Sequence, residues 1–101
     1  MNRRQALAAA GYEQSCIERA SINIVIAAVY ERTAGKYGER AVRYVHMEVG
    51  HAAQNIYLQA IALELGTVVV GAFDDSRVKK ILVMDTDEAP LYIMPVGRAR
   101  K

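Results

Sequence analysis

The sequence predicts an α+β fold in which about three strands pack with a long central helix. The helix is indicated by Tyr44 to Leu65, where apolar residues recur at three- and four-residue spacing on more than one face. The strands are indicated by three apolar or β-branched runs: Ile22 to Tyr30, Thr67 to Val70, and Leu91 to Val96. Neither a linker nor low-complexity sequence separates these elements, so we expect a single domain spanning residues 1–101.

Before the long helix, two short helices, a strand and a loop are predicted. Arg3 to Ala10 is alanine-rich and favours a helix up to the following glycine, and Gln14 to Arg19 adds another turn or two. Ile22 to Tyr30 is too apolar on both faces for an exposed strand, so we expect it to be buried. Glu31 to Arg40 is polar and contains two glycines, which is typical of a loop.

After the long helix, the sequence predicts a turn, one more short helix and the last strand, which makes four helical pieces in all. We expect Gly66 to end the long helix in a left-handed conformation. We expect Asp74 to cap a helix that runs through Leu82, followed by an acidic turn from Asp85 to Ala89. Pro95 implies that the last strand is interrupted or lies at an edge, because proline cannot donate to a sheet ladder.

The composition points to a second copy of the chain as a partner. Hydrophobic residues make up 52% of the sequence, a high share for so small a chain, and the extra apolar surface must be covered. Gly50, Ala52 and Ala53 are small enough to let another helix approach the long helix closely. We therefore expect dimerisation to complete the fold, with two copies forming a homodimer.

Several classes of protein and site are disfavoured. A net charge of +2 is too small to indicate a nucleic acid partner. No apolar run reaches transmembrane length and no signal-peptide pattern is present, so we expect no membrane association and a cytoplasmic location. The lone Cys16 excludes an internal disulfide and is interpreted as a buried structural thiol. His46 and His51 are five residues apart, about 140° around a helix, which does not match the H-E-x-x-H zinc motif, so no metal site is expected.

Three segments are candidates for chemistry, each with a plain structural alternative. Lys36 and Tyr37 could act as a general acid or base, or belong to an ordinary polar loop. The Gly71 to Asp75 turn could offer backbone amides to a flat electron-rich ligand edge or an anion, or simply connect a strand to a capped helix. The basic residues of the C-terminal segment could grip a phosphate or form a solvated tail; they are Arg98, Arg100 and Lys101. Local sequence leaves both interpretations open in each case.

Four sequence blocks in a fixed order carry a resemblance to a known family. They are KYGER, GHAAQN, GAFDD and PVGR. With the residues between them, they resemble the C-terminal half of the flavin-dependent nitroreductase superfamily, and within it the SagB-type dehydrogenase branch. The resemblance implies a homodimeric α+β fold with FMN bound at the subunit interface and the long helix in the dimer seam. Quinones, nitro compounds, azolines and nicotinamide donors are all compatible small-molecule substrates.

The resemblance also assigns roles to the candidate residues. It implies that the backbone of Gly71 and Ala72 lies near the flavin N5 atom with Phe73 close by, and that Arg98 and Arg100 contact the FMN phosphate. In relatives that oxidise azoline rings to azoles, a Lys-Tyr pair acts in proton removal, and Lys36 and Tyr37 match that pair.

The family's N-terminal half, with its Arg-Arg-Ser-x-Arg type motif for FMN, has no match in this sequence. Arg3 and Arg4 lie in a predicted helix that corresponds to the middle of the family's chain, so they are not that motif. We therefore expect a truncated portion of an FMN-dependent oxidoreductase, as an excised piece, a short gene product or one part of a split enzyme. The alternative is a cofactor-free homodimeric remnant or small-ligand-binding module.

Overall fold

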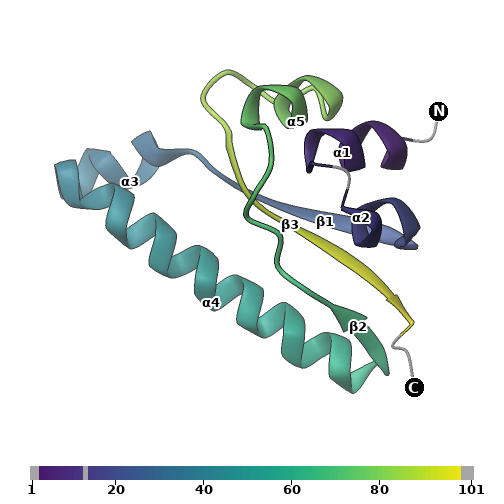
Figure 1. Ribbon diagram of the computed structural model, residues 1–101. Helices are drawn as coiled ribbons and strands as arrows, with labels where there is room; N and C mark the ends of the chain where they lie inside the picture. Colours follow the sequence, from purple (N-terminus) through teal and green to yellow (C-terminus); the bar gives the residue numbers. More distant parts are fainter. Residues whose placement is uncertain (1–2, 13, 99–101) are drawn as a thin grey trace.

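The computed structural model describes residues 3–12 and 14–98 and has an α+β fold with a three-stranded sheet and one long helix (Figure 1). The helices are α1 (Arg4–Ala10), α2 (Ser15–Arg19), α3 (Tyr30–Tyr37), the 3-10 turn η1 (Gly38–Arg40), α4 (Ala41–Ala62) and α5 (Asp75–Ile81). The strands are β1 (Ile22–Ala28), β2 (Leu65–Thr67) and β3 (Ala89–Arg98). The predicted fold class is confirmed, with one more helix than expected.

The sheet is antiparallel, and β3 is its central strand, in the order β1-β3-β2. Val96 of β3 is opposite both Ile22 of β1 and Thr67 of β2. Pairing on the β2 side continues to Thr67 and resumes only at Val70, which exchanges both backbone hydrogen bonds with Ile93. Backbone N–H groups alternate in direction along a strand, so residue 95 would direct its N–H toward the β2 side of β3, within this gap. Residue 95 is a proline and has no N–H to donate. β3 itself is continuous and central, so the edge position is wrong and the expected interruption is limited to pairing on the β2 side.

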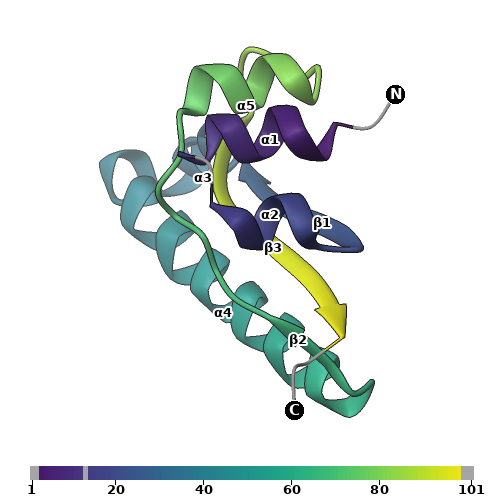
Figure 2. The same cartoon turned by 45° about the vertical axis from the view of Figure 1, so that its right-hand side comes forward.

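The helices lie on two sides of this sheet (Figures 1 and 2). Ile93 belongs to a core cluster with residues from α1, α2 and α5. Met94 is also fully buried, and strand alternation directs it to the opposite face, where α4 packs against β3. The small α2 helix is docked tightly, because a Cβ atom at Gly11 would come within 2.6 Å of the Ile17 Cδ1 atom.

The segment predicted as a polar loop is helical. α3 and η1 cover residues 30–40, and α3 packs against α4. Gly38, with φ of +59°, separates the two short pieces. Its two glycines made this segment resemble a loop, but Gly35 is accommodated within α3 and only Gly38 takes a conformation that favours glycine.

Two further expectations about the ends and edges of elements are wrong. α4 ends at Ala62, and the left-handed residue after it is Glu64, with φ of +61°, whereas Gly66 lies within β2. β1 is an edge strand with only partly buried side chains, and Ile22 is 57% exposed. Its apolar composition therefore does not reflect burial on both faces within one chain.

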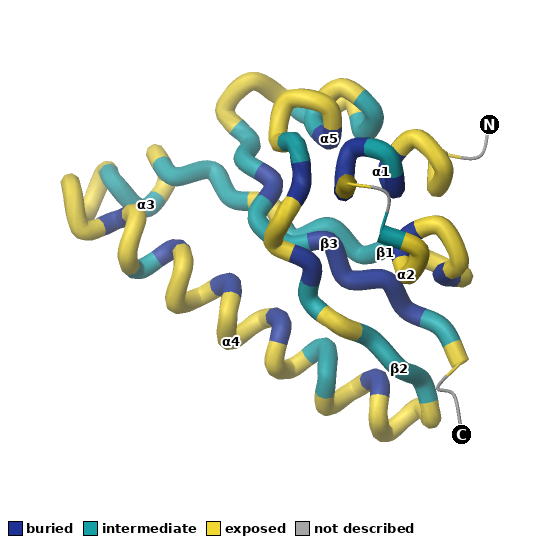
Figure 3. Tube along the Cα trace, viewed as in Figure 1, coloured by how far each residue is buried: buried dark blue, intermediate teal, exposed yellow. Residues whose placement is uncertain are grey.

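α4 buries only one stripe of its surface in this chain (Figure 3). The buried residues are Ala41, Val45, Val49, Ala53 and Ala60. Large apolar side chains on its other faces are exposed; they include Val42, Met47, Leu58 and Ile61, and Leu63 follows the helix. No helix among the described residues is long and apolar enough to cross a membrane.

Candidate functional site

The chain between β2 and α5 forms an exposed turn that is held firmly at both ends. Before the turn, Val70 and Ile93 exchange two backbone hydrogen bonds of 2.8 and 2.9 Å. After it, the Asp74 N–H donates to the Ala10 carbonyl oxygen at 2.7 Å, and the Asp74 carboxylate caps α5 by accepting from the Arg77 N–H. Gly71 and Ala72 between these anchors are exposed. The predicted cap is confirmed.

The side chain of Gln14 hydrogen-bonds to the backbone of this turn. Its Nε2 atom donates to the Ala72 carbonyl oxygen at 3.1 Å and to the Gly11 carbonyl oxygen at 2.8 Å. The expectation that the backbone amides of this turn are free is wrong for Asp74, but within the described part of the chain the Gly71 and Ala72 N–H groups donate to no partner. The turn therefore presents the Gly71 and Ala72 N–H groups to solvent, while hydrogen bonds to the neighbouring residues hold its backbone in place. The sequence gives no signal for Gln14, because Ala72 is 58 residues away.

The side chains of the turn point to different environments. Phe73 is buried in the core cluster, so its ring anchors the turn instead of lining the surface beside it. A Cβ atom added to Gly71 would lie 3.6 Å from Cε1 of Tyr92, an ordinary contact, so crowding within the chain does not require glycine there. The surface of the turn consists mainly of backbone atoms and the Ala72 methyl group.

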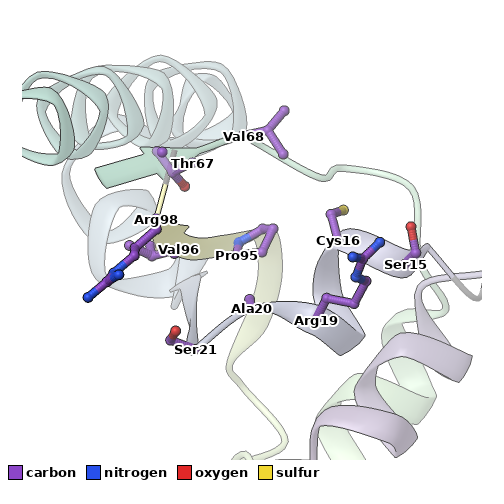
Figure 4. Close-up of a pocket in the computed structure, with 12 residues that line it drawn as sticks. Ser15, Cys16, Arg19, Ala20, Ser21, Thr67, Val68, Pro95, Val96 and Arg98 are labelled. Carbon is purple, nitrogen blue, oxygen red and sulfur yellow. The ribbon is translucent and has the colours of Figure 1, made fainter. Parts of the chain in front are cut away.

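A hollow of about 550 Å³ lies between α2, β2 and the end of β3 (Figure 4). Arg19 and Arg98 belong to its lining, and none of the described lining residues is acidic. The Thr67 hydroxyl faces this region, where it is covered by neighbouring atoms and has no hydrogen-bond partner among the described residues. The family resemblance assigned Arg98 to the FMN phosphate. In the structure, Arg98 is part of a hollow whose lining offers hydrogen-bond donors. Arg100 lies outside the described residues.

Cys16 also lines this hollow and is exposed, so the prediction of a buried structural thiol is wrong. α2 buries Ile17 against α1 and the sheet, and the helix rotation then turns the preceding residue outward. A five-residue helix has too few apolar residues for the sequence to reveal which side is buried.

Tyr37 belongs to the lining of a second hollow, a groove of about 830 Å³ between β1, α3 and α4, whereas Lys36 is not among the described lining residues. The Tyr37 ring lines the groove and meets the Tyr44 ring edge-on at a centroid distance of 5.0 Å. Lys36 Nζ lies 5.3 Å from the Tyr37 ring centroid, and both side chains are exposed. This groove borders the part of β1 that pairs with the start of β3, whereas the Arg98 hollow lies at the end of β3. Among the described residues, Tyr37 and Arg98 therefore line different hollows.

A further polar pair connects α3 to α4. The Tyr30 hydroxyl is hydrogen-bonded to Nε2 of His46 at 2.8 Å, and the two rings meet edge-on. Burial, and secondarily the negative charge of Asp75, raises the pKa of Tyr30 above its ordinary value. The phenol is therefore neutral at physiological pH and serves as a hydrogen-bonding group. Sequence analysis missed this pair because it placed Tyr30 at the end of a strand.

Gln14→Ala is expected to loosen the turn without unfolding the chain. Each lost hydrogen bond is worth about 0.5–1.5 kcal/mol, and the freed Ala72 carbonyl oxygen can bind water instead. Hydrogen exchange measured by mass spectrometry should become faster in peptides that contain Ala72 and Phe73. The matched control is Gln5→Ala, at an exposed position of α1. Equal exchange at the turn in both variants would show that Gln14 does not hold it.

Comparisons with known proteins agree on one family. The family model described as "Nitroreductase family" matches residues 1–98. A protein from Methanocaldococcus jannaschii with the name "Putative nitroreductase" is 56% identical over 92 residues, which cover 91% of this chain and 46% of that protein. This chain thus spans about half the length of the curated relative it matches.

Solved structures show the same fold. One is a protein from Anabaena variabilis, also named as a putative nitroreductase, with a TM-score of 0.90 and 35% identity over 99% of this chain and 20% of that one. Another is the NADPH:FMN oxidoreductase from Vibrio harveyi complexed with NAD+, with a TM-score of 0.82 and 24% identity over 98% of this chain and 46% of that one. The last likeness is evidence for the fold alone. Together with the match over residues 1–98, the comparisons establish that the chain belongs to the nitroreductase family.

Proposed function

We propose that this chain is a portion of an FMN-dependent oxidoreductase of the SagB-type branch, folded as one domain over residues 1–101. The observation that carries the proposal is the anchored turn at Gly71 and Ala72, which offers unpaired backbone donors on a rigid support. Such donors suit the electron-rich edge of a flavin ring, and bound FMN would supply hydride transfer. The name of the Vibrio harveyi relative includes the same cofactor.

The residues present fit this cofactor at two points. Gly71 and Ala72 would face the ring near its N5 atom, with Phe73 holding the turn from the core. Arg98 would contact the phosphate, because a guanidinium group can donate two parallel hydrogen bonds to phosphate oxygens. The unpartnered Thr67 hydroxyl in the adjoining hollow is a further donor that a ligand oxygen would satisfy. Arg100 is proposed for the phosphate by family resemblance alone.

FMN is expected to bind this chain more tightly than riboflavin, because riboflavin lacks the phosphate. The measurement is a titration followed by flavin fluorescence, together with the absorbance spectrum of the purified protein. Micromolar or tighter FMN binding supports the proposal. A stable folded dimer that retains neither FMN nor riboflavin, and does not oxidise a nicotinamide cofactor, would favour the alternative of a cofactor-free homodimeric or small-ligand-binding module.

We further propose that two copies associate through the exposed apolar side of α4. Met47, Leu58 and Ile61 are exposed large apolar residues on this helix, and Ile61 is 71% exposed. Burying apolar area is worth about 25 cal/mol per Å², so a second copy would gain stability by covering them. The family resemblance implies that the proposed FMN site would lie at this seam, with both copies contributing to it.

Ile61→Lys is expected to weaken this dimer, because it would bury an unpaired charge in the seam. The measurement is the mass of the particle in solution by light scattering or sedimentation equilibrium, as a function of concentration. Ile22→Lys is the matched control, at an exposed isoleucine on the edge strand. A dimer that dissociates equally in both variants, or in neither, would argue against α4 as the seam.

Lys36 and Tyr37 are proposed as the catalytic pair that removes a proton from an azoline ring during its oxidation. The two side chains are adjacent and exposed, and Tyr37 lines a groove large enough for a small-molecule or peptide substrate. The protein's location is proposed to be cytoplasmic.

Lys36→Gln and Tyr37→Phe are each expected to lower the rate of azoline oxidation by flavin-loaded protein by about 10²–10⁴-fold, the usual worth of a general acid or base. FMN affinity should remain unchanged, because neither residue lines the Arg98 hollow. Lys80→Gln, at an exposed position of α5, is the control. Undiminished turnover in both active-pair variants would exclude them from the chemistry.

A further inference from the structure

We infer that Arg19 is a second phosphate-binding residue, which acts with Arg98 and Thr67 on a phosphate monoester in the hollow between α2 and the end of the sheet. The inference deepens the proposed function, and it rests on that function only for the identity of the ligand as FMN. The hollow itself, its charge and its donors are features of this chain.

Arg19 is held at the hollow by the docking of α2. Ile17 is fully buried and fills the space beside Gly11, so the helix cannot slide toward α1. The Asn23 side chain donates to the Ile17 carbonyl oxygen at 3.0 Å and ties the helix to β1. Figure 4 places the Arg19 side chain on the α2 wall, with its guanidinium group near Cys16 and Ser15. The backbone position of Arg19 is therefore fixed, while its long side chain can adjust to a ligand.

The two arginines belong to separate walls of the hollow. Arg19 comes from α2, and Arg98 is the last residue of β3. In Figure 4 the Arg98 side chain extends away from Arg19, and both side chains are exposed, so each can rotate toward a bound anion. Among the residues that the structure describes, the lining contains two positive side chains and none that is negative, which makes it attractive to an anion.

Hydroxyl groups complete the donor set. Ser15 and Ser21 line the hollow, and the Thr67 hydroxyl has no partner among the described residues. A covered hydroxyl without a partner is destabilising, and a ligand oxygen that accepts its hydrogen bond would relieve this cost. Two guanidinium groups and several hydroxyl groups are the donor types that bind a phosphate group. At about 550 Å³, the hollow also has room for an organic portion attached to the phosphate.

Cys16 provides a reporter for this hollow. It is the only cysteine of the chain, it is exposed, and it belongs to the same lining as Arg19. We would measure its rate of alkylation by N-ethylmaleimide, an uncharged reagent, by mass spectrometry. FMN and inorganic phosphate should each slow the reaction at least threefold, whereas riboflavin should not. The ratio of rates with and without ligand is compared within each variant, because removing Arg19 can itself change the reactivity of the thiol.

Arg19→Gln is expected to abolish the protection by phosphate and to raise the Kd for FMN at least tenfold, with little change for riboflavin. Arg19→Lys should give an intermediate result, because a lysine keeps the charge without the two-pronged donor. Arg43→Gln, at an exposed position of α4, is the control for lost positive charge. Circular dichroism checks that each variant is folded.

The outcomes separate this inference from the proposed function. If FMN binds equally well to Arg19→Gln and wild type, the inference is overturned and the flavin proposal stands. If phosphate protects Cys16 in an Arg19-dependent manner but no flavin binds, the inference stands and the flavin proposal fails. If neither phosphate nor FMN changes the alkylation rate of the wild-type protein, the inference is overturned.

Discussion

The pair of backbone hydrogen bonds between Val70 and Ile93 is the constraint on which the candidate site depends. Pro95 interrupts pairing along the β2 side of β3, so these bonds are the next point at which the chain leaving β2 is joined to the sheet. They determine where Gly71 and Ala72 emerge, and the burial of Phe73 together with the bond from Asp74 to α1 completes the anchoring. Each bond contributes only about 0.5–1.5 kcal/mol net, but together they fix the orientation of exposed donors.

The two hollows and the exposed turn lie at successive positions along β3. The groove beside Tyr37 borders the β1 segment that pairs with the start of β3, the exposed turn lies beside Tyr92 and Ile93, and the hollow with Arg98 lies at the end of the strand. Ten residues of strand span roughly 33 Å, so these features cannot all touch one small ligand. A division between a cofactor end and a substrate end is the arrangement that this spacing favours.

The high apolar content of the sequence is explained only in part by the core of one chain. Ile17, Val78, Ile93 and Met94 are fully buried, yet α4 leaves large apolar side chains in contact with solvent. A chain that spans about half of its curated relative has a correspondingly smaller interior to hide them. The exposed side of α4 is the apolar surface that the proposed association with another copy would cover.

The fold class, the long helix, the interruption at Pro95 and the Asp74 cap were determined by the sequence alone, because each depends on local periodicity or on the chemistry of one residue. Local sequence wrongly predicted a loop for residues 31–40. The segment is helical because it packs against α4, although it contains two glycines. Gln14 beneath the turn and the shared lining of Arg19 and Arg98 were decided only by tertiary structure. Gln14 and Ala72, like Arg19 and Arg98, are tens of residues apart in the sequence. No local pattern therefore predicts that they come together.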